Sequence, residues 1–80
     1  MEARNIKTDT IELKKLMVEK GFETINSLST ASGVSRNTLG KVLNGKIQPS
    51  ADVMYKLVET LEIPAPKAGT IFFAYILRTA

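Results

Sequence analysis

Residues 24–45 read TINSLSTASGVSRNTLGKVLNG, and this stretch decides how the rest of the chain is interpreted. Its first part, about Thr24–Ser32, has small or apolar residues at helical spacing, namely Ile25, Leu28 and Ser29. Gly33 follows, and glycine readily takes the positive φ at which many helices end. The pattern therefore predicts a short helix that stops at a tight turn.

A second short helix is predicted at about Arg36–Leu43. Ser35 is a good N-cap for it, and Val34 is expected to bury in the angle between the two helices. Three residues share one inward face because they lie three and four apart: Leu39, Val42 and Leu43. Asn44 and Gly45 end the helix. Two helices that cross steeply over a short glycine-containing turn form a helix-turn-helix.

The outward face of the second helix has the chemistry of base recognition. Four residues lie opposite the apolar face: Arg36, Asn37, Gly40 and Lys41. Arginine can donate two hydrogen bonds to a guanine edge, and asparagine can bond an adenine edge with both the oxygen and the nitrogen of its side-chain amide. We assign DNA contacts to Arg36, Asn37, Thr38, Lys41, Asn44 and Lys46, the last two at the sugar-phosphate backbone. The alternative is an ordinary helical hairpin with a solvated polar face.

The motif resembles the helix-turn-helix of phage repressors of the Cro and lambda-repressor type. The matching residues are Leu28, Gly33, Val34, Leu39, Val42, Asn44, Gly45 and Lys46. The resemblance implies an all-α fold, a compact five-helix bundle over roughly Thr8–Phe73, with helices two and three as the motif. It also implies a transcriptional regulator whose third helix enters the major groove, with Arg36, Asn37 and Lys41 at base-reading positions.

Three residues depart from the family pattern. Ile25 stands where the family often has a glutamine that contacts the DNA backbone, so either that contact is missing or Thr24 or Asn26 replaces it. Ser29 stands where a small alanine lets the helices approach, and serine is nearly as small. Gly40 lies inside the recognition helix, where glycine costs about 1 kcal/mol relative to alanine.

Composition narrows the classes of function. The 80 residues suit a single domain, with a loose arm at 1–7 and a tail at 74–80. There is no cysteine and no histidine, so we expect neither an enzyme nor a bound metal or cofactor. The net charge of +3 suits double-stranded DNA as a partner. We see neither a secretory signal nor a membrane span, and expect an intracellular protein. The resemblance to phage repressors implies the cytoplasm of a bacterial host.

Two further helices should support the motif. The first begins after Thr8 or Asp9 and ends at Gly21. Helical spacing is followed by Leu13, Leu16, Met17 and Lys20, with Ile11 and Val18 flanking, and the apolar residues of this stripe are expected to be core. Four of its residues form a solvated face, namely Lys14, Lys15, Glu19 and Lys20. Ser50 caps the fourth helix, whose inward stripe is Met54, Leu57, Val58 and Leu61. Ile63–Pro66 breaks that helix.

The last segment allows two interpretations. A helix at about Pro66–Phe73 fits the spacing of its apolar residues, whereas Thr70–Leu77 also fits a short buried strand by its β-branched and aromatic content. We favour the helix, with Ile71 and Phe72 closing the core. The remaining apolar residues are assigned to an interface with a second chain: Phe73, Tyr75, Ile76 and Leu77.

Two functions of different class follow from these patterns. The first is a phage-type regulator that binds operator DNA, in a switch between lysis and lysogeny. The second is a modulator or antirepressor that acts through a protein complex with the phage repressor. The chain resembles, in size and plan, the small Cro-like modulator of repression of temperate lactococcal phages, and this resemblance implies the repressor as a partner. A homodimer is the other candidate assembly.

Overall fold

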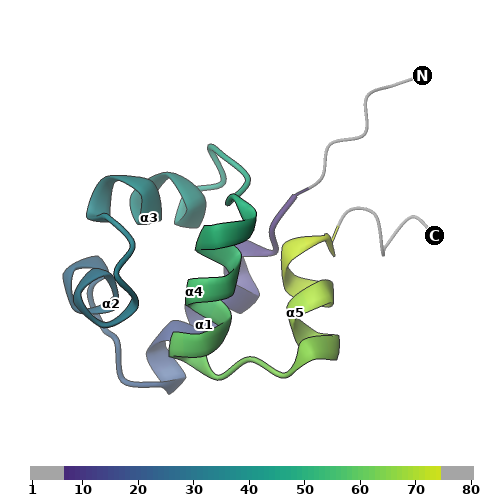
Figure 1. Ribbon diagram of the computed structural model, residues 1–80, viewed down its shortest axis with the longest axis horizontal. Coiled ribbons are helices and arrows are strands. Elements are labelled where there is room, and N and C mark those ends of the chain that lie inside the picture. Colours follow the sequence, from purple (N-terminus) through teal and green to yellow (C-terminus); the bar gives the residue numbers. More distant parts are fainter. Residues whose placement is uncertain (1–6, 75–80) are drawn as a thin grey trace.

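Five helices make up the described part of the protein. The computed structural model describes residues 7–74. The helices are α1 Thr10–Glu19, α2 Ile25–Ser32, α3 Arg36–Leu43, α4 Ala51–Leu61 and α5 Ala65–Phe72, with no strand in this range. In Figure 1, α2 and α3 lie together on one side, α4 passes in front of α1, and α5 lies on the other side. This arrangement confirms the predicted all-α fold with α2 and α3 as the motif.

Side-chain caps set the starts of the first four helices. Asp9 Oδ1 accepts the Glu12 amide at 3.2 Å, so Asp9 rather than Thr8 caps α1. Ser35 and Ser50 cap α3 and α4 as predicted, each accepting the amide three residues later at 3.2 Å. Thr24 caps α2, which therefore begins at Ile25. Each cap satisfies one of the amides that have no partner at a helix N-terminus.

The helix ends depend on residues in the left-handed region. Gly33 has φ 81° and ends α2, as its position predicts. α4 ends at Leu61 because Glu62 turns the chain with φ 54° and ψ 48°. Glu62 is the only residue other than glycine with positive φ in the described range. This conformation is unfavourable for a residue with a Cβ, so the turn after α4 is strained.

The core draws on every helix. Its fully buried side chains are Leu13, Leu28, Leu39, Val42, Leu57, Leu61, Ile71 and Phe72, and no polar or charged side chain of residues 7–74 is buried. Met54 and Val58 are only partly buried. The prediction that the apolar residues of α1 are all core is wrong for Ile11 and Val18, which are 73% and 61% exposed. They lie on the opposite face from Leu13, Leu16 and Met17, which determine how α1 packs.

The C-terminal part of the described chain is helical. Thr70–Phe72 belongs to α5, so the strand alternative is wrong there, and α5 begins and ends one residue before the predicted Pro66–Phe73. Residues 75–77 lie outside the described residues. Ile71 and Phe72 are buried, as expected. Ala74, predicted as tail, is also buried, and its amide donates to the carbonyl of Lys7 at 3.1 Å.

Gln48 joins three distant segments. It lies in the loop between α3 and α4 and is half-buried. Its Nε2 donates to the Phe72 carbonyl at 2.6 Å, and its Oε1 accepts the Thr8 hydroxyl at 3.0 Å. The Asp9 amide also donates to the Ile71 carbonyl at 2.7 Å. The loop that follows α3 is therefore tied to both ends of the described chain.

Candidate nucleic-acid interface

Side-chain hydroxyls hold the turn between α2 and α3. Val34 is only 5% exposed and fills the angle between the helices, as predicted. Ser29 Oγ donates to the Val34 carbonyl at 2.6 Å, and Ser32 Oγ accepts the Val34 amide at 3.2 Å. Ser29 thus keeps the small size that the crossing needs and adds a hydrogen bond that alanine cannot make. Both polar groups of the Val34 backbone are satisfied within the turn.

The outward face of α3 forms a shallow hollow of about 250 Å³. Its lining consists of Arg36, Asn37, Gly40, Lys41, Asn44 and Lys46. The structure therefore brings together five of the six residues that sequence analysis assigned to DNA. The inward residues Leu39, Val42 and Leu43 are at most 4% exposed, and their burial fixes the direction of the hollow. The inward face of α3 therefore packs in the core, and its outward face lines the hollow.

Thr38 does not line this hollow. It is half-buried, and its hydroxyl accepts a hydrogen bond from Ser35 Oγ at 3.0 Å. Its amide donates to the same Ser35 hydroxyl at 3.2 Å. The structure therefore places Thr38 in the N-terminal cap of α3.

Gly40 lies in the hollow, although the sequence prediction did not include it among the binding residues. Its spacing was the available signal, because it lies four residues after Arg36 and four before Asn44 on one helical face. A Cβ built at Gly40 meets no atom within 4 Å. Packing inside the protein therefore does not require glycine there, and its effect is to leave the helix backbone uncovered.

The hollow is surrounded by positive charge. Residues 24–51 contain no aspartate or glutamate, and their three cations are Arg36, Lys41 and Lys46. The ion pairs within the described chain all lie elsewhere: Lys15–Glu12, Lys20–Glu62, Lys56–Asp52 and Lys67–Glu12. The field at the hollow is therefore uncompensated, and it attracts a polyanion.

The N-terminus of α2 has one side chain available for a DNA phosphate. Thr24 uses its hydroxyl to accept the Ser27 amide at 3.0 Å and to donate to Ser27 Oγ at 3.2 Å. Ile25 is half-buried against the core and cannot supply a polar contact. Asn26 is exposed, and its side-chain amide has no hydrogen-bond partner among the described residues. Asn26 is therefore the better candidate to replace the family's glutamine.

Residues 7–74 contain no group of three acidic side chains that could hold a metal ion. None of their helices combines the length and the apolarity needed to cross a membrane. Phe73, assigned to a partner interface, is 38% exposed at the end of α5. The other residues of that predicted interface, Tyr75, Ile76 and Leu77, lie outside the described residues.

Comparison with known proteins agrees with this geometry. A family model described as helix-turn-helix matches residues 13–67, which include α2, α3 and α4 completely. No curated protein and no solved structure matches the sequence. The family comprises DNA-binding regulators rather than enzymes. The chain therefore belongs to the Cro- and C1-type helix-turn-helix family of DNA-binding transcription regulators.

Proposed function

We propose that this protein is a phage-type transcriptional regulator that binds operator DNA through the hollow on α3 and takes part in a lysis/lysogeny switch. The phage assignment is supported by the resemblance to Cro and lambda repressor. One observation carries the DNA contact: Arg36, Lys41 and Lys46 surround one hollow and have no ion pair among the described residues. Cations held against the duplex in this way would release counterions and make binding dependent on salt.

The residues of the hollow divide by the part of DNA that they would contact. Arg36, Asn37 and Lys41 lie along α3 and would read base edges in the major groove. Asn44 and Lys46 follow at the C-terminal end of α3 and would hold the sugar-phosphate backbone. Because Gly40 has no side chain, the helix backbone could come close to the bases between these two groups. Gly40 would therefore set the depth of α3 in the groove.

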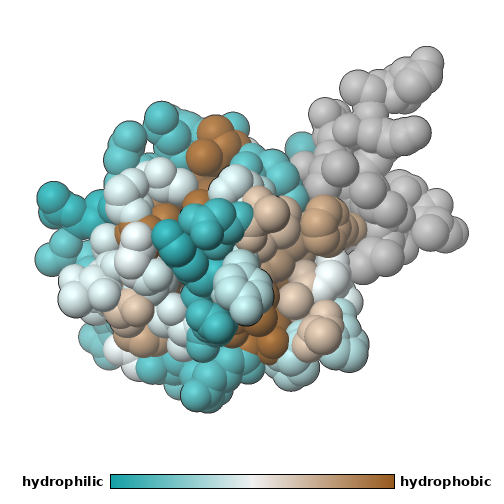
Figure 2. Space-filling model, viewed as in Figure 1, coloured by the Kyte–Doolittle hydropathy of each residue, from teal (hydrophilic) through white to brown (hydrophobic). Residues whose placement is uncertain are grey.

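Useful affinity would require a second chain. One small module buries limited DNA surface, and dimers of such modules read two half-sites. The hydrophobic colour on the face shown in Figure 2 gathers mainly over α4 and α5. Phe73 is partly exposed at the end of α5. We propose that Phe73 and the apolar residues Tyr75, Ile76 and Leu77 form the dimer or partner interface.

A salt titration tests the DNA contact. The full chain is titrated against duplexes that it enriches from a random-sequence pool, at several salt concentrations. The three cations of the hollow give a slope of log K against log salt of at most about −2.7 per chain, of which the phosphate contact of Lys46 supplies about −0.9. Lys46→Ala should weaken binding to all sequences and reduce the slope by about 0.9. The matched control is Lys56→Ala, because Lys56 lies on α4 and pairs with Asp52. Equal effects of the two substitutions would refute the assignment.

Base reading has its own test. Arg36→Ala should cost about 1–3 kcal/mol on the preferred sequence and relax the preference at one base pair, because a bidentate contact is lost. Asn37→Ala should do the same at a different base pair. If each variant loses affinity uniformly over all sequences, these side chains contact phosphates rather than bases.

A modulator or antirepressor that acts in complex with the phage repressor is the second candidate. It is favoured by the small number of cations at the hollow and by the exposed Phe73. Such a protein would show no sequence-dependent DNA binding alone, but would elute with its cognate repressor as one complex from a sizing column. A DNA-binding regulator gives the opposite pair of results.

A further inference from the structure

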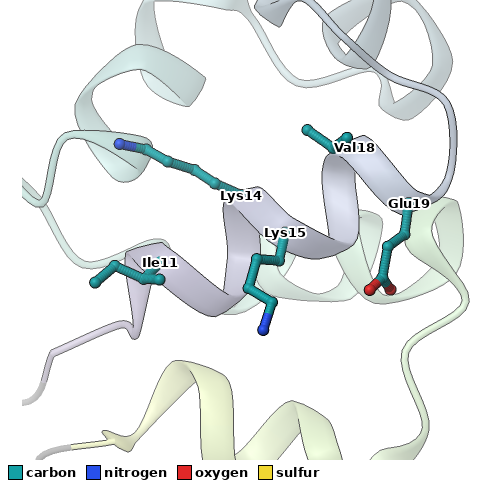
Figure 3. Close-up of a pocket in the computed structure, with 5 residues that line it drawn as sticks. All are labelled: Ile11, Lys14, Lys15, Val18 and Glu19. Carbon is teal, nitrogen blue, oxygen red and sulfur yellow. The ribbon is translucent and has the colours of Figure 1, made fainter.

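The outer face of α1 has an apolar hollow that DNA binding does not explain. The hollow has a volume of about 500 Å³ and is lined by Ile11, Lys14, Lys15, Val18 and Glu19. Ile11 and Val18 are among the most exposed large hydrophobic residues of the described chain, at 73% and 61%. Figure 3 shows all five side chains on α1, with Ile11 and Val18 toward its two ends. Because Ile11 and Val18 lie in one apolar hollow rather than singly on the surface, they mark a candidate docking surface.

The spacing of these residues suits a helical ligand. Ile11 and Val18 are seven residues apart, which corresponds to two helical turns and a rise of about 10.5 Å. Lys14 and Lys15 lie between them and extend to opposite sides of α1 (Figure 3). Their aliphatic stems complete the apolar walls, while their ammonium groups stand at the two rims. A second amphipathic helix can lie along this stripe.

Lys14 and Lys15 can both pair with acidic groups of a partner. Lys14 has no ion pair among the described residues. Lys15 Nζ is 3.9 Å from Glu12 Oε1, and the other oxygen of Glu12 is 3.3 Å from Lys67. Glu12 is therefore already shared with the closer Lys67. Lys14 and Lys15 make the middle of the α1 hollow positive, while the carboxylate of Glu19 lies at its Val18 end. The complementary surface is therefore acidic opposite the two lysines.

We propose that the outer face of α1 binds an acidic amphipathic helix of another protein. Apolar side chains two turns apart would cover Ile11 and Val18, and flanking carboxylates would pair with Lys14 and Lys15. A second copy of this chain fits poorly, because a two-fold axis centred on the stripe sets lysine against lysine. DNA fits poorly too, because the exposed apolar side chains of Ile11 and Val18 would face phosphates. The proposal does not depend on the DNA-binding function.

A pair of synthetic peptides tests this surface. The first is a helix-stabilised peptide of about 16 residues, with leucines two turns apart and flanking glutamates. Its twin has lysines in place of the glutamates. Binding to the full chain is measured by fluorescence anisotropy, and the site is located by the amide NMR shifts of the labelled protein. The acidic peptide should bind and shift α1 amides, and its affinity should fall as salt rises. The lysine twin should bind at least about tenfold more weakly.

Variants of the protein complete the test. The double variant with Ile11→Ala and Val18→Ala should bind the acidic peptide at least about tenfold more weakly than the wild-type protein. Alanine is chosen because it preserves the helix. Tyr55→Ala is the matched control, because Tyr55 is 65% exposed on α4 and should have no effect. Lys14→Glu with Lys15→Glu should reverse the preference, so that the lysine twin binds more tightly than the acidic peptide. This charge swap gives a gain of binding that a damaged fold cannot produce.

Several results would overturn the proposal. They include equal binding of the two peptides, shifts confined to α3 or α4, and no binding of the acidic peptide up to about 1 mM. The face would be a self-interface instead if the free chain forms a dimer and the double variant with Ile11→Ala and Val18→Ala does not. If the double variant with Lys14→Glu and Lys15→Glu loses as much affinity for duplex DNA as Lys46→Ala does, these two lysines contact DNA instead.

Discussion

Gln48→Ala is the most informative single substitution for the fold. The side-chain amide of Gln48 is the only one among the described residues that bridges two segments far from it in sequence, 24 and 40 residues away. Alanine removes both hydrogen bonds at once. The Phe72 carbonyl and the Thr8 hydroxyl then lose their partners in a half-buried site. The loop that carries Lys46 should loosen from the rest of the domain.

The magnitude follows from these two bonds. A hydrogen bond contributes about 1 kcal/mol net, and leaving a buried partner unsatisfied costs about 1–3 kcal/mol. Because water reaches a half-buried site, we expect the lower end of that range, about 2 kcal/mol for the pair. This is a large part of the total for 80 residues, which is about 4–12 kcal/mol. The melting temperature should fall by about 8–16 °C.

Urea and thermal unfolding followed by circular dichroism measure the effect. Gln48→Met is the control, since methionine restores the volume without the hydrogen bonds and should be nearly as unstable as alanine. Thr8→Ala should cost about 1 kcal/mol alone and less in the Gln48→Ala background, because the two residues share a bond. Wild-type stability of Gln48→Met would show that Gln48 acts by packing. A loss below about 0.5 kcal/mol for Gln48→Ala would refute the reasoning altogether.

Three further predictions concern backbone strain and core packing, all measured by urea unfolding. Gly33→Ala should cost about 1–2 kcal/mol because φ is 81°, whereas Gly40→Ala should stabilise the free protein by about 1 kcal/mol because a Cβ there meets open space. A loss of stability for both variants would mean that the space beside Gly40 is not open to a Cβ. Glu62→Gly should be about 1 kcal/mol more stable than Glu62→Ala, since both lose the ion pair to Lys20 and only glycine relieves the φ of 54°. Phe72→Ala should cost about 3–5 kcal/mol, and a cost near 1 kcal/mol would show that the core collapses into the space.

Features set by neighbouring residues could be predicted from the sequence. The caps at Ser35 and Ser50 and the left-handed Gly33 each depend on a few adjacent positions, and all three have the expected geometry. The direction of the α3 face follows from the same local information, because burial of Leu39 and its neighbours fixes which side chains point outward. The location of the α3 hollow could therefore be predicted from the sequence, whereas its contacts with DNA are a proposal.

Features set by distant residues could not be predicted in the same way. The sequence around Gln48 shows only a loop before a proline, whereas its two partners lie at opposite ends of the described chain. Ile11 and Val18 illustrate a different difficulty. A helix of ten residues with apolar side chains on two faces offers two ways to pack, and only the neighbouring helices decide between them.

The recognition surface depends on the rest of the domain more than its own sequence suggests. An isolated helix as short as α3, with eight residues and a glycine inside, is not stable in water. Its inward leucines and the hydroxyls of Ser29 and Ser32 that hold the turn therefore create the hollow by positioning α3. It follows that a core substitution should reduce the folded fraction without changing base preference. A substitution of Arg36 or Asn37 should change base preference without changing stability. The two effects separate because the two faces of α3 share only the helix backbone. Among the described residues, no hydrogen bond or ion pair joins a side chain on the inward face to one on the outward face.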